Sequence, residues 1–135
     1  MSNVNQIIIE FNCILLDLAK NIATICPDSI IGRNIKDIDK VLRNSEHKSK
    51  FIDVFVTKIL PYKKEIDAGN DDFFMSKTSY DEDFEGYESW TSKVFEFKSI
   101  WGKLKRDNKD LVIQFMQILC QLAQNYFIII LEQVD

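Results

Sequence analysis

Glycine and proline are scarce in this 135-residue chain, which contains only four and two of them. Turns and tight loops depend on these residues, so their scarcity argues against an all-β or loop-rich fold. Histidine is rarer still: the single copy, His47, has neither a second histidine nor clustered cysteines to complete a zinc site. A nucleophilic dyad on His47 would need a serine or cysteine that no pattern supplies. We therefore interpret His47 as a surface residue and expect no metal and no other cofactor.

Cysteine occurs three times, as the widely spaced Cys13, Cys26 and Cys120. The odd number and the spacing do not form a secreted disulfide framework, which favours a reducing compartment. Cys13 and Cys120 stand in apolar runs, where a free cysteine usually behaves as a small buried hydrophobe. The N-terminus lacks the basic segment and the small-residue cleavage site of a signal peptide.

Positive charge is in deficit, because the net charge is −4 and the isoelectric point is about 5.0. This balance argues against a general nucleic-acid-binding surface. The four glycines are isolated from one another, so the chain has no glycine-rich phosphate loop. No pattern indicates a small-molecule substrate, and we predict that the protein is not an enzyme.

All charge is missing from residues 111–131, LVIQFMQILCQLAQNYFIIIL. Four glutamines, Gln114, Gln117, Gln121 and Gln124, are spaced three, four and three apart and predict one narrow stripe on a helix. Because the rest of that helix is apolar, we expect it at the centre of a bundle. The stretch is long enough to span a membrane, but its glutamines and the polar residues 107–110 argue against that. We expect the stripe to be partly exposed or to contact another subunit, since amides are desolvated more cheaply than charges.

The remaining segments supply helices that could surround this one. Apolar residues at three- and four-residue spacing predict helices over 4–25, 30–43 (firmly over 34–43), 46–60 and 89–106, with a further helical turn at 62–66. Pro27 ends the first helix, Asp28 or Ser29 caps the second, and Asp107 or Asn108 caps the last. Gly69-Asn70 closes the turn at 62–66 with residues that tolerate a left-handed conformation. The length fits one domain, residues 1–135, and no internal repeat occurs. The sequence thus predicts an all-α single-domain bundle of about five helices with a central C-terminal helix and one long loop.

That loop, residues 67–88, mixes acidic and aromatic residues in DAGNDDFFMSKTSYDEDFEGYE. Disordered segments are poor in aromatics, so we predict a long loop pinned to the domain by Phe73 and Phe74. Its acidic residues lack the alternating ligands and central glycine of a helix-loop-helix calcium site. We interpret the loop as a surface for a protein partner. The candidate interaction residues are Phe73, Phe74, Tyr80, Phe84 and Tyr87, together with the four glutamines of the stripe.

The predicted helix over 89–106 combines lysines with aromatics, as nucleic-acid-binding and membrane-surface patches do. However, Trp90, Val94, Phe97 and Trp101 fall on one helix face. This spacing favours an amphipathic helix whose tryptophans belong to the core.

Three stretches resemble small helical proteins encoded by large nucleocytoplasmic DNA viruses. They are FNCILLDLAKNIATICPDS (11–29), FVTKILPYKKEIDAGNDDFFMS (55–76) and NKDLVIQFMQILCQLAQNY (108–126). The resemblance carries no catalytic motif. It implies a viral protein made in the host cytoplasm and packaged in virions, and it implies no reaction.

We therefore expect a non-catalytic viral structural or protein-interaction module that binds a protein partner or itself. Two alternatives stay open. One is a host-factor-binding helical bundle with a groove for a peptide helix. The other is a nucleic-acid-binding accessory protein, although the acidic balance disfavours it.

Overall fold

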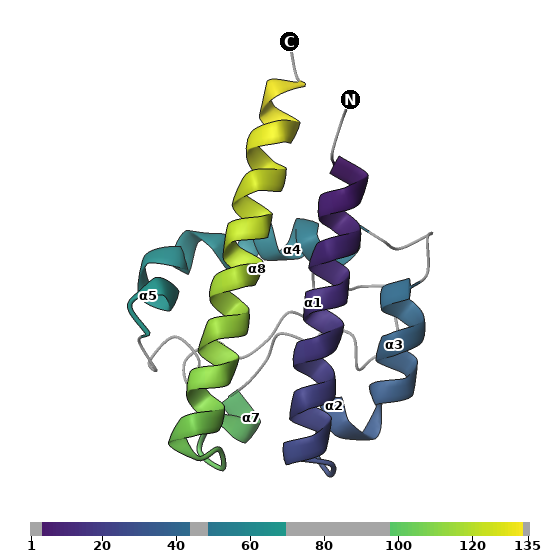
Figure 1. The fold of residues 1–135 in the computed structure, drawn as a ribbon, viewed down its shortest axis with the longest axis vertical. Helices are drawn as coiled ribbons and strands as arrows, with labels where there is room; N and C mark the ends of the chain where they lie inside the picture. Colours follow the sequence, from purple (N-terminus) through teal and green to yellow (C-terminus); the bar gives the residue numbers. More distant parts are fainter. Residues whose placement is uncertain (1–3, 44–48, 70–97, 134–135) are drawn as a thin grey trace.

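The computed structural model describes residues 4–43, 49–69 and 98–133, and within these ranges every regular element is helical. The predicted all-α bundle is therefore confirmed (Figure 1). Its elements are α1 (Val4–Ile25), α2 (Ile30–Arg33), α3 (Ile35–Arg43), α4 (Lys50–Lys58), the 3-10 turn η2 (Leu60–Tyr62), α5 (Lys63–Asp67), α7 (Lys98–Trp101) and α8 (Arg106–Glu132).

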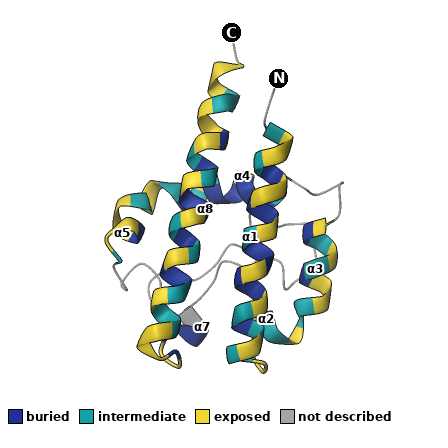
Figure 2. Ribbon diagram, in the orientation of Figure 1, coloured by how far each residue is buried: buried dark blue, intermediate teal, exposed yellow. Residues whose placement is uncertain are grey.

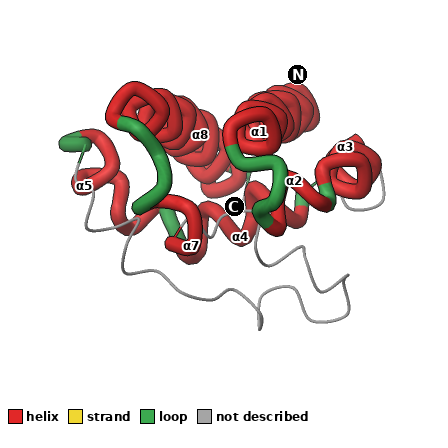
Figure 3. Tube along the Cα trace, turned by 90° about the horizontal axis from the view of Figure 1, so that it is seen from below, coloured by secondary structure: helices red, strands yellow, loops and turns green. Residues whose placement is uncertain are grey.

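The two longest helices, α1 and α8, lie side by side and antiparallel, with the start of α1 and the end of α8 at the same end of the molecule (Figure 1). Helix α4 crosses one face of this pair, α5 packs beside α8, and α2 and α3 pack beside α1. Seen from below, α1 and α8 form one layer and α4 and α7 lie beneath it (Figure 3). The C-terminal helix is central in the sense that it contacts α1, α4, α5 and η2.

The core lies between the α1–α8 layer and α4. Phe11 of α1 and Phe55 of α4 are fully buried and meet edge to face, with ring centroids 5.3 Å apart. Burying one such side chain contributes about 1.5–3 kcal/mol. Ile66 of α5 and Trp101 of α7 belong to the same core. Ile100 and Trp101 are both buried, which confirms the core position predicted for Trp101.

Helix α8 is buried along one face, and its exposed surface is wider than the narrow glutamine stripe that the sequence predicted. Its buried residues lie along one face only, and the opposite face is exposed in the view of Figure 2. The buried residues are Val112, Ile113, Met116, Leu119, Cys120, Ala123 and Tyr126. The physical reason is the two-layer arrangement, because within the described ranges no helix covers the face of α8 opposite α4.

Several predicted helix boundaries are confirmed. Helix α1 ends at Ile25, just before Cys26-Pro27. Ser29 caps α2, since its hydroxyl accepts a hydrogen bond from the Gly32 amide at 3.0 Å. Gly69, with φ of 72°, takes the left-handed conformation expected at the end of the α5 segment.

The firm part of the second helix, predicted over 34–43, is confirmed by α3 (Ile35–Arg43). Asn34 separates α3 from α2, because its side chain donates to the Ile30 carbonyl (2.8 Å) while its backbone leaves the α conformation. Other boundaries were predicted wrongly. The helix expected over 46–60 ends at Lys58, and Pro61 lies within η2, which leads into α5. The helix expected to reach residue 106 ends at Trp101. The cap of α8 is Lys105, not Asp107 or Asn108.

Some predictions lie outside the described residues. They concern His47, the start of the 46–60 helix, residues 70–88 of the loop, and residues 89–97 with Trp90.

Gly32 is fixed by a close approach of the backbone. A Cβ atom built on it would lie 2.5 Å from the Cys26 carbonyl oxygen and 2.6 Å from that of Pro27. Both atoms belong to the turn that joins α1 to α2. The glycine therefore weakens α2 locally but permits the turn to pack against it.

We predict that Gly32→Ala destabilises the protein by about 2 kcal/mol, because overpacking costs more than the better helix propensity of alanine returns. Urea denaturation measures the difference. Gly102→Ala is the control, since nothing lies within 4 Å of its added Cβ. Equal stabilities of the two variants would contradict the close approach.

Tyr126 joins α8 to α4 by donating a hydrogen bond to the Asp53 carboxylate, with 2.6 Å between the oxygens. Burial, together with this hydrogen bond and the negative charge of Asp53, raises the pKa of Tyr126 above its ordinary value. A raised pKa means that the folded state holds the phenol proton more tightly than the unfolded chain does. The resulting stability is complete below the unfolded pKa of about 10 and is lost as the pH rises above it.

We predict that Tyr126→Phe costs about 1 kcal/mol at pH 7, because it removes one hydrogen bond to a partly exposed carboxylate. The difference in free energy of unfolding between wild type and variant should narrow above about pH 10, because only the wild type can lose stability by ionisation of the phenol at residue 126. Urea denaturation at pH 7 and pH 10.5 measures it. A gap that stays constant would contradict the assigned hydrogen bond.

Candidate functional site

Exposed large hydrophobic side chains gather on α8. Of the six in the described part of the chain, four belong to this helix: Ile118 (47% exposed), Phe127 (41%), Ile128 (47%) and Leu131 (55%). Monomeric surfaces scatter such residues singly, whereas interaction surfaces concentrate them. Two of these four, Ile118 and Ile128, lie on the face of α8 opposite its buried residues, and this exposed face is the first candidate for a functional surface.

This face has a regular pattern. Leucine, isoleucine and amide residues recur at alternating intervals of three and four, with every member exposed except the half-buried first. We call this set the outer row; it consists of Leu111, Gln114, Ile118, Gln121, Asn125 and Ile128. Alternating three- and four-residue spacing keeps a row on one side of a helix over several turns. Gln121 also donates to the Asn125 side-chain oxygen (3.1 Å), so neighbouring amides within the row are linked.

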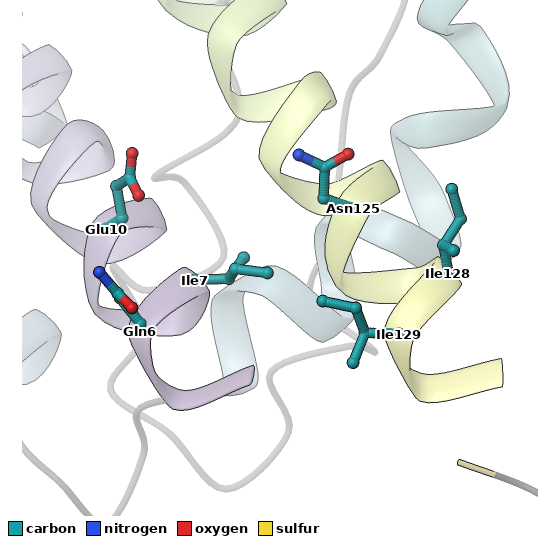
Figure 4. Close-up of a pocket in the computed structure, with 6 residues that line it drawn as sticks. All are labelled: Gln6, Ile7, Glu10, Asn125, Ile128 and Ile129. Carbon is teal, nitrogen blue, oxygen red and sulfur yellow. The ribbon is translucent and has the colours of Figure 1, made fainter. Parts of the chain in front are cut away.

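Two shallow depressions flank the outer row. One, of about 590 Å³, lies against α5 and is lined by Lys63, Asp67, Gln114, Gln117, Ile118 and Gln121. The other, of about 380 Å³, lies between α8 and the first turns of α1 and is lined by Gln6, Ile7, Glu10, Asn125, Ile128 and Ile129. Figure 4 shows Ile7 of α1 and Ile129 of α8 pointing toward each other across the second depression. Each depression thus contains one exposed isoleucine of the outer row.

The four glutamines predicted as one stripe are divided by the structure. Gln114 and Gln121 are exposed, whereas Gln117 and Gln124 are half-buried at one flank. The expectation of a partly exposed stripe holds for the first two. Gln117 serves the fold instead, because its Nε2 donates to the carbonyls of Ile66 (3.1 Å) and Asp67 (3.3 Å) at the end of α5. The Ile66 carbonyl already accepts a hydrogen bond from the Gly69 amide (3.0 Å), so Gln117 adds a second bond to it and one to the Asp67 carbonyl at the end of this five-residue helix.

We predict that Gln117→Glu lowers the free energy of unfolding by about 1–2 kcal/mol, because a carboxylate cannot donate to these carbonyls and repels them. Gln114→Glu adds the same charge at an exposed position on the same helix and should change stability by less than about 0.5 kcal/mol. Urea denaturation at matched low chain concentration compares them. The assigned role of Gln117 would be wrong if both variants had the same stability.

Sequence reasoning missed Ile118, Asn125 and Ile128 as members of the exposed surface. The signal was present, because these residues continue the three-four alternation begun by Gln114 and Gln121. The stripe was instead drawn through glutamines alone, which mixes the outer row with its flank. The other candidate interaction residues, Phe73, Phe74, Tyr80, Phe84 and Tyr87, lie outside the described residues.

Other chemistry is sparse in the described ranges. No group of three or more His, Cys, Asp or Glu side chains that could hold a metal ion occurs within them. Burial raises the pKa of the Cys120 thiol to about 12, so this thiol stays protonated near neutral pH. Cys13 is exposed, contrary to the prediction, because it lies on the side of α1 away from the core.

A third hollow, of about 480 Å³, lies between α1 and α3. Ile9, Leu16 and Leu42 provide much of its apolar lining, and Asp17, Lys20 and Arg43 provide charged groups. Lys20 and Arg43 are both near Asp39, the former at 4.0 Å, so part of this charge is already paired.

Helix α8 is, within the described residues, the one helix that is long and apolar enough to cross a membrane by length and composition. A core helix of a soluble protein passes the same test, and a third of the most apolar window is buried here (33%).

Comparisons with protein-family models, with curated proteins and with solved structures found no match to this chain.

Proposed function

We propose that this protein is a non-catalytic protein-interaction module whose contact surface is the outer row of α8 with its two flanking depressions. One observation carries the proposal: α8 has no charged residue from Leu111 to Leu131, yet the face opposite its buried side is exposed and includes Ile118 and Ile128. The buried centre of a protein interface is depleted in charge and rich in apolar groups.

Solvation energetics support this use of the face. Removing a charged group from water costs far more than removing an amide, and an amide recovers most of that cost when it forms hydrogen bonds. A face made of isoleucine, leucine, glutamine and asparagine can therefore be covered cheaply. Charged residues would have served solubility better at the same positions, so their absence over six turns of helix favours a contact surface.

The resemblance to small helical viral proteins supports a narrower form of this proposal. In that form, the protein is a viral structural or interaction protein of the host cytoplasm that is packaged in virions. Quantifying the chain in purified particles against infected-cell cytoplasm tests it, and absence from the particles would contradict packaging.

The hollow between α1 and α3 favours a second candidate function, a groove that accepts an amphipathic helix of a host factor. Its apolar lining residues, Ile9, Leu16 and Leu42, lie between two helices, as helix-in-groove recognition requires. The groove is shorter than the outer row, because α3 spans only nine residues. We therefore place it second.

Photo-crosslinking distinguishes the two surfaces. A photoreactive amino acid is introduced into the full chain at Ile118 on the outer row, at Cys13 beside the groove, or at the exposed Asp37 on α3 as control. We expect the Ile118 position to give a discrete protein adduct at least about tenfold above the Asp37 position, since central interface positions are shielded from water by their partner. An adduct from Cys13 alone would favour the groove. No adduct from either would contradict an interaction module.

A further inference from the structure

We infer that the partner on the outer row is a second copy of this chain, with α8 packed against α8 in parallel across a two-fold axis. This inference rests on the proposed function and names its partner. It is carried by the charge, the spacing and the shape of the exposed α8 face.

The charge argument concerns self-complementarity. In a two-fold interface the same patch meets itself, so a charged residue near the axis faces its own copy. Like charges in such a position are strongly unfavourable. Between Leu111 and Ile128 the outer row carries none, and neither do the α8 positions beside it, Phe115, Leu122 and Ile129 on one flank and Gln117 and Gln124 on the other. The charges nearest to the row lie at its ends, on Asp110 and Glu132, and at the outer sides of the depressions, on Lys63 and Asp67 of α5 and Glu10 of α1.

The amides add positive complementarity. Each glutamine or asparagine side chain both donates and accepts hydrogen bonds, so it can pair with an identical residue. A partner with charged residues on its binding helix would find no countercharge on α8 to pair with them. A second copy needs none.

The spacing matches a coiled-coil seam. With intervals alternating between three and four, Leu111, Ile118 and Asn125 occupy the first core position of successive heptads, and Gln114, Gln121 and Ile128 occupy the second. A single asparagine at the first core position sets the register and oligomeric state of coiled coils. Asn125 lies at such a position, between Gln121 and Ile128 on the outer row.

The order of residues selects the parallel direction. In a parallel pair each row residue faces its own copy, so isoleucine meets isoleucine and amide meets amide at every level. In an antiparallel pair centred on the same row, Ile118 would face Gln121. The parallel arrangement alone therefore matches apolar with apolar groups throughout.

The two depressions have the positions that knobs-into-holes packing requires. In a parallel pair the partner's Ile118 would enter the hole formed by Gln114, Gln117, Ile118 and Gln121. These are the α8 residues that line the depression beside α5. The partner's Ile128 would enter a hole formed by Asn125, Ile128, Ile129 and Glu132, of which the first three line the depression beside α1 (Figure 4).

A charge-swap experiment on the full chain tests the pairing. Sedimentation equilibrium of the wild type should give twice the 15.8 kDa chain mass. Gln121→Glu and Gln121→Lys should each weaken self-association at least about tenfold, because like charges then face each other. An equimolar mixture of the two variants should restore the dimer, since opposite charges meet only if residue 121 faces its own copy. Circular dichroism checks that each exposed-site variant stays folded.

Asn5→Glu and Asn5→Lys are the matched controls, because Asn5 is an exposed amide on α1 that lies outside the row. They should leave the dimer unchanged. A mixture of the Gln121 variants that stays monomeric would overturn the parallel pairing.

A wild type that stays monomeric at hundreds of micromolar would overturn self-association altogether. A monomer that gives adducts with a different protein from Ile118, or that binds phosphatidylcholine vesicles, would assign the row to another partner. Adducts with a different protein would leave the proposed interaction function intact and remove only the inference that the partner is a second copy. Loss of Ile118 adducts of every kind would remove both.

Discussion

The antiparallel packing of α1 on α8 over α4 is the constraint on which the rest of this structure depends. It brings the N-terminal and C-terminal helices together and creates the core, in which Phe11, Phe55 and Met116 are fully buried. Specific contacts fix the shorter helices to this pair. Ser29 and Gly32 allow the turn that places α2 beside α1, and Gln117 hydrogen-bonds the end of α5 beside α8. Because the described helices pack on α8 from the side of α4 and from its flanks, the opposite side of α8 is exposed in the described part of the structure.

That one-sided cover separates two demands on the α8 sequence. The inner face must fill the core, and it does so with Val112, Met116, Leu119 and Ala123. The outer face has no such demand from the fold, and lysine or glutamate there would cost the monomer nothing. Its uncharged composition is therefore a constraint that the fold does not explain, and the proposed association of two such faces would account for it.

The sequence predicted the elements whose evidence is local. The three- and four-residue spacing of apolar residues located α1 and α8, and Pro27, Ser29 and Gly69 marked ends that the structure confirms. It could not predict the break at Asn34, which depends on a side chain that competes with the backbone for the Ile30 carbonyl. Nor could the sequence separate the exposed glutamines from the half-buried ones, because the hydrogen bonds from Gln117 to α5 join residues about fifty positions apart. The apolar composition of α8 predicted that other helices would pack against it, but only the tertiary arrangement shows which face of α8 they bury.

The hydrogen bond from Tyr126 to Asp53 also marks where the cover of α4 ends along α8. Before it, opening a turn of α8 exposes core side chains. After it, none of residues 127–133 is buried, and among the described elements the first turns of α1 lie beside them (Figure 1). Backbone amides in the two parts of this one helix therefore differ in the free energy needed to expose them to hydrogen exchange. We therefore expect this single continuous helix to comprise a slowly exchanging segment within the domain and a more rapidly exchanging end, whose order a bound partner would change without disturbing the core.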